Sequence, residues 1–131
     1  MNQTAIDYGQ AQIAAFSNGA AAGEIRYDPD VARQAAAEYQ KMIIGLIEIR
    51  DRLLEAINPN GFGGFKSAQD LQKGFGRKAS DGVDVLNQLV EGAMRLQEAY
   101  FRSGNMIAEA DQCNASRTRF VADSAALRDP S

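Results

Sequence analysis

Few side chains of this 131-residue chain belong to the types that carry out common catalytic reactions. It has no histidine and a single cysteine, Cys113. The absence of histidine excludes Ser-His and Cys-His nucleophilic pairs and the commonest zinc ligand sets, which leaves only carboxylates for acid-base or metal chemistry. One cysteine cannot form an internal disulfide. The sequence therefore predicts a protein that is not an enzyme.

Three remaining groups could hold a ligand or react, and none has a complete pattern. Asp81 and Asp84 are three residues apart, but further oxygen ligands at loop spacing are missing, so any cation site there would be weak. Gly74 and Gly76 lack the preceding strand of a phosphate-binding loop. Cys113 is interpreted as a half-buried residue near a helix end, with an intermolecular disulfide or a reactive thiol as the alternatives. We predict no metal and no cofactor.

Composition limits the classes of partner. Hydrophobic residues make up 45% and charged residues 24% of the chain, as in an ordinary globular domain, and the length fits one domain. A net charge of -3 argues against nucleic-acid binding, which needs a clustered basic face. No apolar run is long enough for a transmembrane segment, and the N-terminal residues lack the pattern of a signal peptide. If the protein leaves the cytoplasm, we expect a signal-peptide-independent route.

A dense cluster of helix-breaking residues divides the chain. Asn58-Pro59-Asn60-Gly61-Phe62-Gly63-Gly64-Phe65 has a long apolar-periodic segment on each side. Proline and glycine interrupt helices, and asparagine and glycine accept left-handed backbone, so this cluster predicts a chain reversal. The aromatic residues in the turn motif, Phe62 and Phe65, suggest that it packs against something. They either contact another protein or cap the end of the chain's own core.

The segments on either side predict two long antiparallel helices. Asp28-Pro29-Asp30 is typical of a helix start, and residues 29–57 and 66–112 both repeat apolar or small residues every three or four positions. Each segment has a second apolar row, which exceeds what a two-helix hairpin buries on its own. We therefore predict an all-α hairpin that completes a four-helix bundle by dimerisation. The residues expected to contact the partner helices are Ile43, Ile47, Leu54, Val83, Val90, Met94 and Phe101.

Three regions follow from these boundaries. Residues 1–27 form an N-terminal extension that includes a candidate short helix at 5–20. Residues 28–113 form the hairpin domain, in which Tyr100 is read as a core residue. The polar tail, residues 114–131, is expected to be frayed or disordered.

The arrangement resembles the WXG proteins, small helical hairpins exported by the type VII (ESX) secretion systems of actinobacteria and other Gram-positive bacteria. Phe62-Gly63-Gly64 matches the aromatic-x-Gly turn, with Phe in place of the usual Trp. Near the end of the second helix, Ile107 and Asp111 lie where family members that carry the export signal have Tyr-x-x-x-Asp or Glu. The acid is present, and the Tyr position holds Ile107. The resemblance covers about residues 29–112.

The resemblance implies a non-enzymatic, secreted protein that acts through helix-helix contacts. Its partners would be a second copy in a homodimer or a paired WXG-like protein, and one subunit would supply the export signal to a type VII secretion ATPase. The alternative is a helical adaptor or structural coiled-coil subunit that stays in the cytoplasm. In that case, Asp111 is a solvated helix-end acid.

Overall fold

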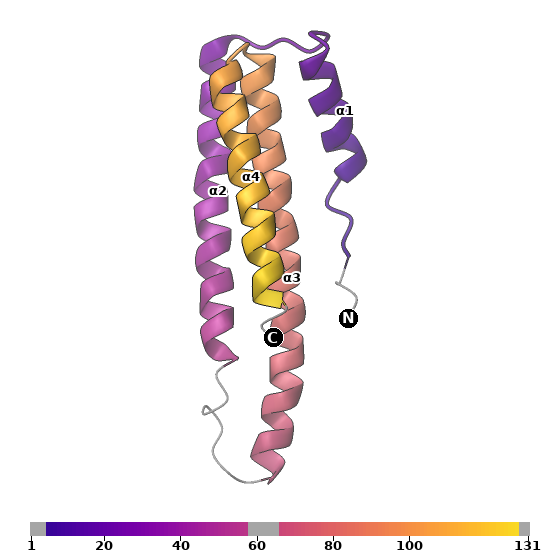
Figure 1. The fold of residues 1–131 in the computed structure, drawn as a ribbon, viewed down its shortest axis with the longest axis vertical. Helices are drawn as coiled ribbons and strands as arrows, with labels where there is room; N and C mark the ends of the chain where they lie inside the picture. The colour runs from indigo at the N-terminus through magenta and orange to yellow at the C-terminus, as the bar shows by residue number, and fades with distance from the viewer. Residues whose placement is uncertain (1–4, 58–65, 129–131) are drawn as a thin grey trace.

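The computed structural model describes residues 5–57 and 66–128, which form helices joined by turns and contain no strand (Figure 1). The all-α class predicted from the sequence is confirmed for this part of the chain. The turn motif Phe62, Gly63, Gly64 and Phe65 lies outside the described residues. The four helices are α1 Gln10–Ala21, α2 Pro29–Ala56, α3 Lys66–Ser103 and α4 Ile107–Arg128.

The start of α2 follows directly from its sequence. The Asp28 carboxylate accepts a hydrogen bond from the Asp30 backbone N–H at 2.9 Å, which satisfies one of the free donors of the first turn. Pro29 occupies the first helical position, where its missing N–H is not needed. The helix then continues for 28 residues to Ala56, one residue before the predicted end.

The second long helix is shorter than predicted. It ends at Ser103, not at residue 112, because Asn105 adopts left-handed backbone with φ of 61°. The Met106 N–H donates to the Phe101 carbonyl at 2.7 Å, and the Asn105 N–H donates to the Arg102 carbonyl at 3.0 Å. This pair of bonds is a Schellman motif, which terminates a helix. The chain reverses there and begins α4.

The predicted disorder of the C-terminal tail is wrong for residues 114–128, which belong to the 22-residue helix α4. Among residues 107–126 of α4, Glu109 is half-buried, and the other buried or half-buried residues recur every three or four positions, at Ala110, Cys113, Arg117, Phe120 and Ser124. Only Phe120 among them is large and apolar. The inner face of this helix therefore consists mostly of small and polar residues. Because such a composition is typical of a solvent-exposed tail, the sequence did not indicate a packed helix here. Residues 129–131 lie outside the described range.

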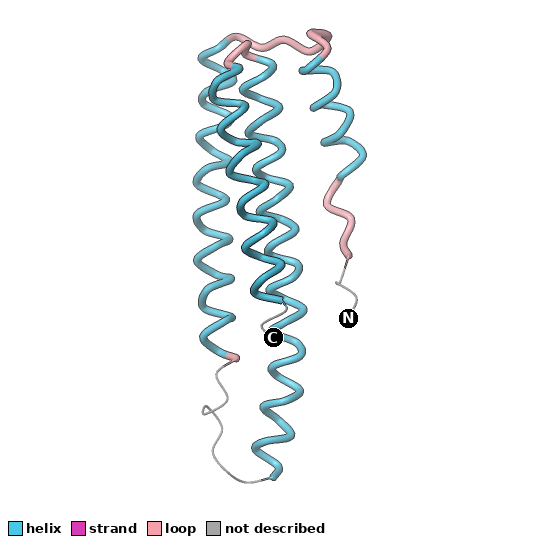
Figure 2. The backbone as a smooth tube through the Cα atoms, viewed as in Figure 1, coloured by secondary structure: helices cyan, strands magenta, loops and turns pink. Residues whose placement is uncertain are grey.

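Helix α3 is the central element of the fold (Figures 1 and 2). Its neighbours α2, α4 and α1 each pack against it, whereas no pair among those three brings Cα atoms within 8 Å in the described ranges. Helices α2 and α3 run in opposite directions, and α4 reverses the direction again. The core cluster consists of Ile43, Val90 and Ala93, with Phe120 of α4 packed against it.

The N-terminal extension reaches α3 through α1 and the linker that follows it. Gly23 ends α1 with φ of 76°, and the Tyr27 N–H then donates to the Ser103 carbonyl at 2.9 Å. Tyr100 lies at the centre of an aromatic group, with ring centroids 4.8 Å from Phe16, 5.7 Å from Tyr27 and 5.9 Å from Tyr39. These contacts join α1, the linker, α2 and α3 at one end of the bundle.

Candidate functional site

The residues predicted to contact a partner line the contacts between the chain's own helices. Ile43, Val83 and Val90 are 3%, 5% and 0% exposed, so they are core residues of the single chain. Ile47, Leu54, Met94 and Phe101 are half-buried. Phe120 of α4 packs against Ile43 and Val90, so this part of the row is covered within the single chain, and contact of the row with a partner stays a prediction.

A groove remains between α2 and α4, with α3 as its floor. Its volume is about 520 Å³. Its apolar lining includes Ile43, Ile44, Ile47, Met94 and Phe101, and polar side chains of α2, α3 and α4 complete it. Four residues of the predicted partner row therefore border this groove, namely Ile43, Ile47, Met94 and Phe101.

Gln97 of α3 makes hydrogen bonds to both α2 and α4 at the polar side of the groove. This side chain is 7% exposed, and its Nε2 donates to the Ala36 carbonyl at 3.1 Å and to Gln40 Oε1 at 2.9 Å. On the other side, its Oε1 accepts a weak hydrogen bond from Cys113 Sγ at 4.0 Å. One buried amide thus links α2, α3 and α4.

Cys113 is half-buried in this contact. Burial raises the pKa of its thiol above the usual 9.0, and the nearby Glu98 carboxylate raises it further. A thiol that holds its proton more tightly is a weaker nucleophile at neutral pH. The environment therefore favours the packing role over the reactive-thiol alternative.

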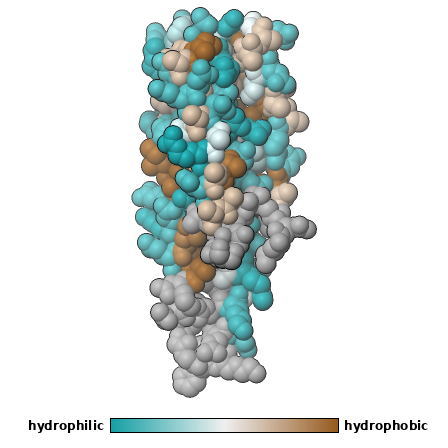
Figure 3. Space-filling model, in the orientation of Figure 1, coloured by the Kyte–Doolittle hydropathy of each residue, from teal (hydrophilic) through white to brown (hydrophobic). Residues whose placement is uncertain are grey.

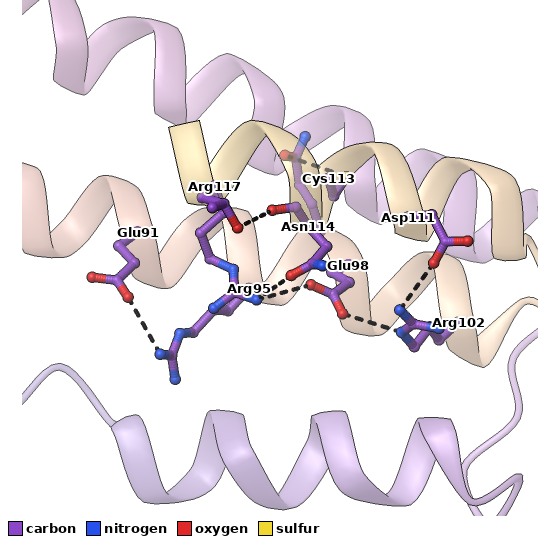
Figure 4. Close-up of polar contacts among 10 residues, drawn as sticks. Glu91, Arg95, Glu98, Arg102, Asp111, Cys113, Asn114 and Arg117 are labelled. Atoms are coloured by element: carbon purple, nitrogen blue, oxygen red, sulfur yellow. Dashed lines mark hydrogen bonds and ion pairs between the residues drawn. The ribbon is translucent and has the colours of Figure 1, made fainter. Parts of the chain in front are cut away.

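Ion pairs join α3 to α4 beside the groove (Figure 4). Glu98 binds Arg102 through Oε2 at 3.1 Å and Arg117 through Oε1 at 3.4 Å. Arg102 also reaches Asp111 at 3.3 Å. The Glu98 side chain is 18% exposed, so water screens its two pairs less than it screens fully exposed pairs.

The two residues that match the family's export signal lie on the first turns of α4. Ile107 is 46% exposed, and the Asp111 side chain is 67% exposed. A spacing of four residues places them on one face of the helix. Asp111 is therefore a partly solvated acid that also contributes to the α3–α4 contact through Arg102.

A second groove, which the sequence reading missed, lies between α1 and α2 on another side of α3. Its volume is about 340 Å³, and its lining is almost entirely apolar: Tyr8, Ile13, Tyr39, Met42, Leu46, Leu89, Gly92, Ala93 and Leu96. Met42 is 51% exposed at this groove. Tyr39, Met42 and Leu46 belong to the apolar repeat of residues 29–57, which predicts a helix but gives no sign of a groove beside it.

The surface carries further apolar side chains. On α2, Val31, Ile44 and Ile49 are 50%, 57% and 51% exposed. Figure 3 shows one face of the molecule, where hydrophobic residues form separate groups on a mostly hydrophilic surface. Within residues 5–57 and 66–128, the acidic and cysteine side chains form no group of three or more that could hold a metal ion. No helix in these ranges combines the length and apolar character that crossing a membrane requires.

Comparisons with known proteins identified no relative: no family model, no curated protein and no solved structure matches the chain.

Proposed function

We propose that this chain is a non-enzymatic type VII (ESX) secretion substrate, or the co-secreted partner of one, and that it acts through helix-helix contacts. The observation that carries the proposal is the outer surface of α2. This helix packs on α3 and still exposes about half of each of three large apolar side chains that share one side of it, Val31, Met42 and Ile49, whereas the exposed Ile44 faces the groove between α2 and α4. Exposed apolar side chains concentrated on one element are typical of a protein contact surface.

The groove between α1 and α2 has the form that suits a helix. Its walls come from two helices and its floor from α3, and its lining is apolar along Tyr39, Met42 and Leu46. Ile49 continues this row of α2 at the next helical spacing. An amphipathic helix of a partner would cover the row with residues spaced three or four apart.

The arrangement of the family-like residues adds support. Helices α2 and α3 lie antiparallel on the two sides of the segment that contains Phe62-Gly63-Gly64, and Ile107 and Asp111 follow on the exposed start of α4. The proposal includes dimerisation, with a second copy or a paired WXG-like protein as the partner. It also includes contact with a type VII secretion ATPase through the start of α4.

Export from the native host tests the proposal. The tagged chain should be found in the medium of cells with an intact type VII system and only in the cell pellet when the secretion ATPase is inactivated. Ile107→Tyr should raise the exported fraction, because it supplies the aromatic residue of the family signal, and Asp111→Asn should lower it. Asp123→Asn is the matched control, since Asp123 is an exposed acid further along α4. Retention of every form in the pellet of intact cells would favour the cytoplasmic adaptor.

Association is measured on the purified chain. Met42→Asp introduces a charge into the exposed part of the second groove and should weaken binding to the partner while the helical content stays unchanged. Val90 is unsuitable for this test because it is completely buried in the monomer core. Equal affinity of the Met42→Asp and unsubstituted chains would remove this groove from the contact.

A further inference from the structure

Arg50 of α2 reaches the place where α2, α3 and α4 meet. Its side chain is 14% exposed. Its Nη1 donates a hydrogen bond to Asn87 Oδ1 of α3 at 3.2 Å, and its guanidinium carbon lies 5.4 Å from the centroid of the Phe120 ring of α4. Because a guanidinium group has only donors, the oxygen of the Asn87 amide must face Arg50. The Nδ2 atom of Asn87 is therefore left for another partner.

Ser124 of α4 lies at the same level of the bundle as Asn87. The ring of Phe120 packs against the core cluster that contains Val90. Asn87 precedes Val90 by three residues and Ser124 follows Phe120 by four, so each lies one turn further along the same face of its helix. Since α3 and α4 run in opposite directions, both steps lead the same way along the bundle. The register thus places Asn87 and Ser124 in neighbouring positions of the α3–α4 contact.

Both side chains carry a polar atom that lacks a partner. Asn87 is 6% exposed and Ser124 is 5% exposed. Asn87 Nδ2 and Ser124 Oγ are buried and form no hydrogen bond with any group of residues 5–57 and 66–128. Buried polar atoms in proteins are nearly always paired, and an internal water molecule often supplies the pairing. These two atoms therefore call for a small ligand between them.

The chemistry of the two groups favours water as that ligand. An amide N–H can only donate, whereas a hydroxyl group both donates and accepts, so one water molecule can bond to both. Asp51 accepts hydrogen bonds from Nε and Nη2 of Arg50 at 3.2 and 3.0 Å, so a carboxylate already balances the nearest cation. The site consequently has no excess positive charge that would favour an anion over water.

We infer that one internal water molecule bridges Asn87 Nδ2 and Ser124 Oγ. It completes a buried polar layer, defined as Arg50 of α2, Asn87 of α3, the water and Ser124 of α4, linked in that order by hydrogen bonds. In this layer each orphaned atom gains a partner, which removes the cost of burying it. The layer joins the C-terminal half of α4 to the other two long helices, and it does not depend on the proposed export.

A high-resolution crystal structure of the full chain tests the site directly. It should show an ordered water within about 3.2 Å of both Asn87 Nδ2 and Ser124 Oγ. A direct hydrogen bond between the two side chains, or an ion in place of the water, would overturn the inference. So would a contact with neither water nor ion in it.

Urea denaturation tests the contribution of the water in solution. Ser124→Ala should raise the equilibrium constant for unfolding at least about threefold relative to Ser116→Ala, because it removes one of the two protein groups that hold the water. Ser116 is an exposed serine of the same helix, so the gain in helix propensity from serine to alanine is common to both variants. A Ser124 hydroxyl without a partner predicts the opposite sign, since its removal would relieve an unpaired buried group.

A double-mutant cycle tests whether the two side chains share the water. In the Asn87→Ala background, Ser124→Ala should change the unfolding constant by less than about twofold, because the water has already lost its other protein partner. Circular dichroism establishes that each variant is folded before urea is added. If Ser124→Ala has the same effect in both backgrounds, no water bridges the pair, and the inference fails.

Discussion

Gly104 and Ala32 are in direct contact where α2 begins and α3 ends: a Cβ built at position 104 would stand 2.7 Å from the Ala32 Cβ. Ala32 is fully buried, and the Pro29 backbone lies 3.4 Å from the same point. The turn between α3 and α4 can therefore approach the first turn of α2 only because residue 104 has no side chain.

Gly104→Ala should lower the free energy of unfolding by about 1–3 kcal/mol, since the added methyl group overpacks a contact that includes backbone. Urea denaturation followed by circular dichroism measures the change. Gly45→Ala is the matched control, because a Cβ there meets no atom within 4 Å. In the middle of α2, that change should stabilise the protein by roughly 0.5–1 kcal/mol. Equal effects of the two substitutions would contradict the close packing at Gly104.

Glu98→Gln should destabilise the protein by about 1–3 kcal/mol, because it leaves the partly buried Arg102 and Arg117 without their shared carboxylate. The same substitution at Glu38 provides the comparison. The Glu38–Lys41 pair is 73% and 75% exposed, so its loss should change stability by less than about 0.5 kcal/mol. Thermal unfolding of both variants gives the test, and equal midpoints would show that the Glu98 pairs do not hold α4.

The Cys113 thiol should make stability decrease in mildly alkaline solution. Burial, followed by the charge of Glu98, raises its pKa in the folded chain above the 9.0 of an exposed thiol. The folded state therefore keeps its proton when the unfolded state releases it. The stabilisation is complete below the unfolded pKa and is lost as pH rises through the folded pKa. Urea titrations from about pH 8 to 10 should show a smaller decline for Cys113→Ser. Parallel pH profiles would contradict a shifted thiol.

Phe16→Ala should release α1 from the bundle without unfolding the rest. Helix α1 has 12 residues, a length at which an isolated helix is marginal in water, so its order depends on packing such as the contact of Phe16 with Tyr100. Hydrogen exchange should accelerate in α1 and remain slow in the middle of α3. Asn18→Ala, on an exposed position of the same helix, is the control. Uniform acceleration in every helix would instead mean that α1 unfolds only with the whole chain.

The start of α2 could be predicted because capping is local. Asp28, Pro29 and Asp30 contain the full signal within three residues. The end of α3 was missed because Ser103, Ile107 and Ala110 continue the spacing of threes and fours across the turn. Periodicity alone therefore concealed Gly104 and Asn105, whose joint tendency to end a helix is also local.

The candidate site was harder to predict because burial depends on which elements meet. Ile43 and Val90 were correctly recognised as apolar-face residues, but their neighbour was assigned to another chain. Helix α4 carries no apolar stripe that would identify it as that neighbour, since its inner face consists of residues such as Ala110, Cys113 and Ser124. The exposure of Met42 likewise depends on the path of α1, which has only a weak pattern of its own.

The central position of α3 also has a kinetic consequence. Its contacts with α2 and α4 join helices that follow one another in the chain, but the antiparallel α2–α3 pair also brings together residues that are far apart in sequence, such as Gln97 and Ala36, which are 61 positions apart. Because α2 and α4 both require α3 as a surface, substitutions that weaken α3 should slow folding. Those in α1 or α4 should mainly accelerate unfolding.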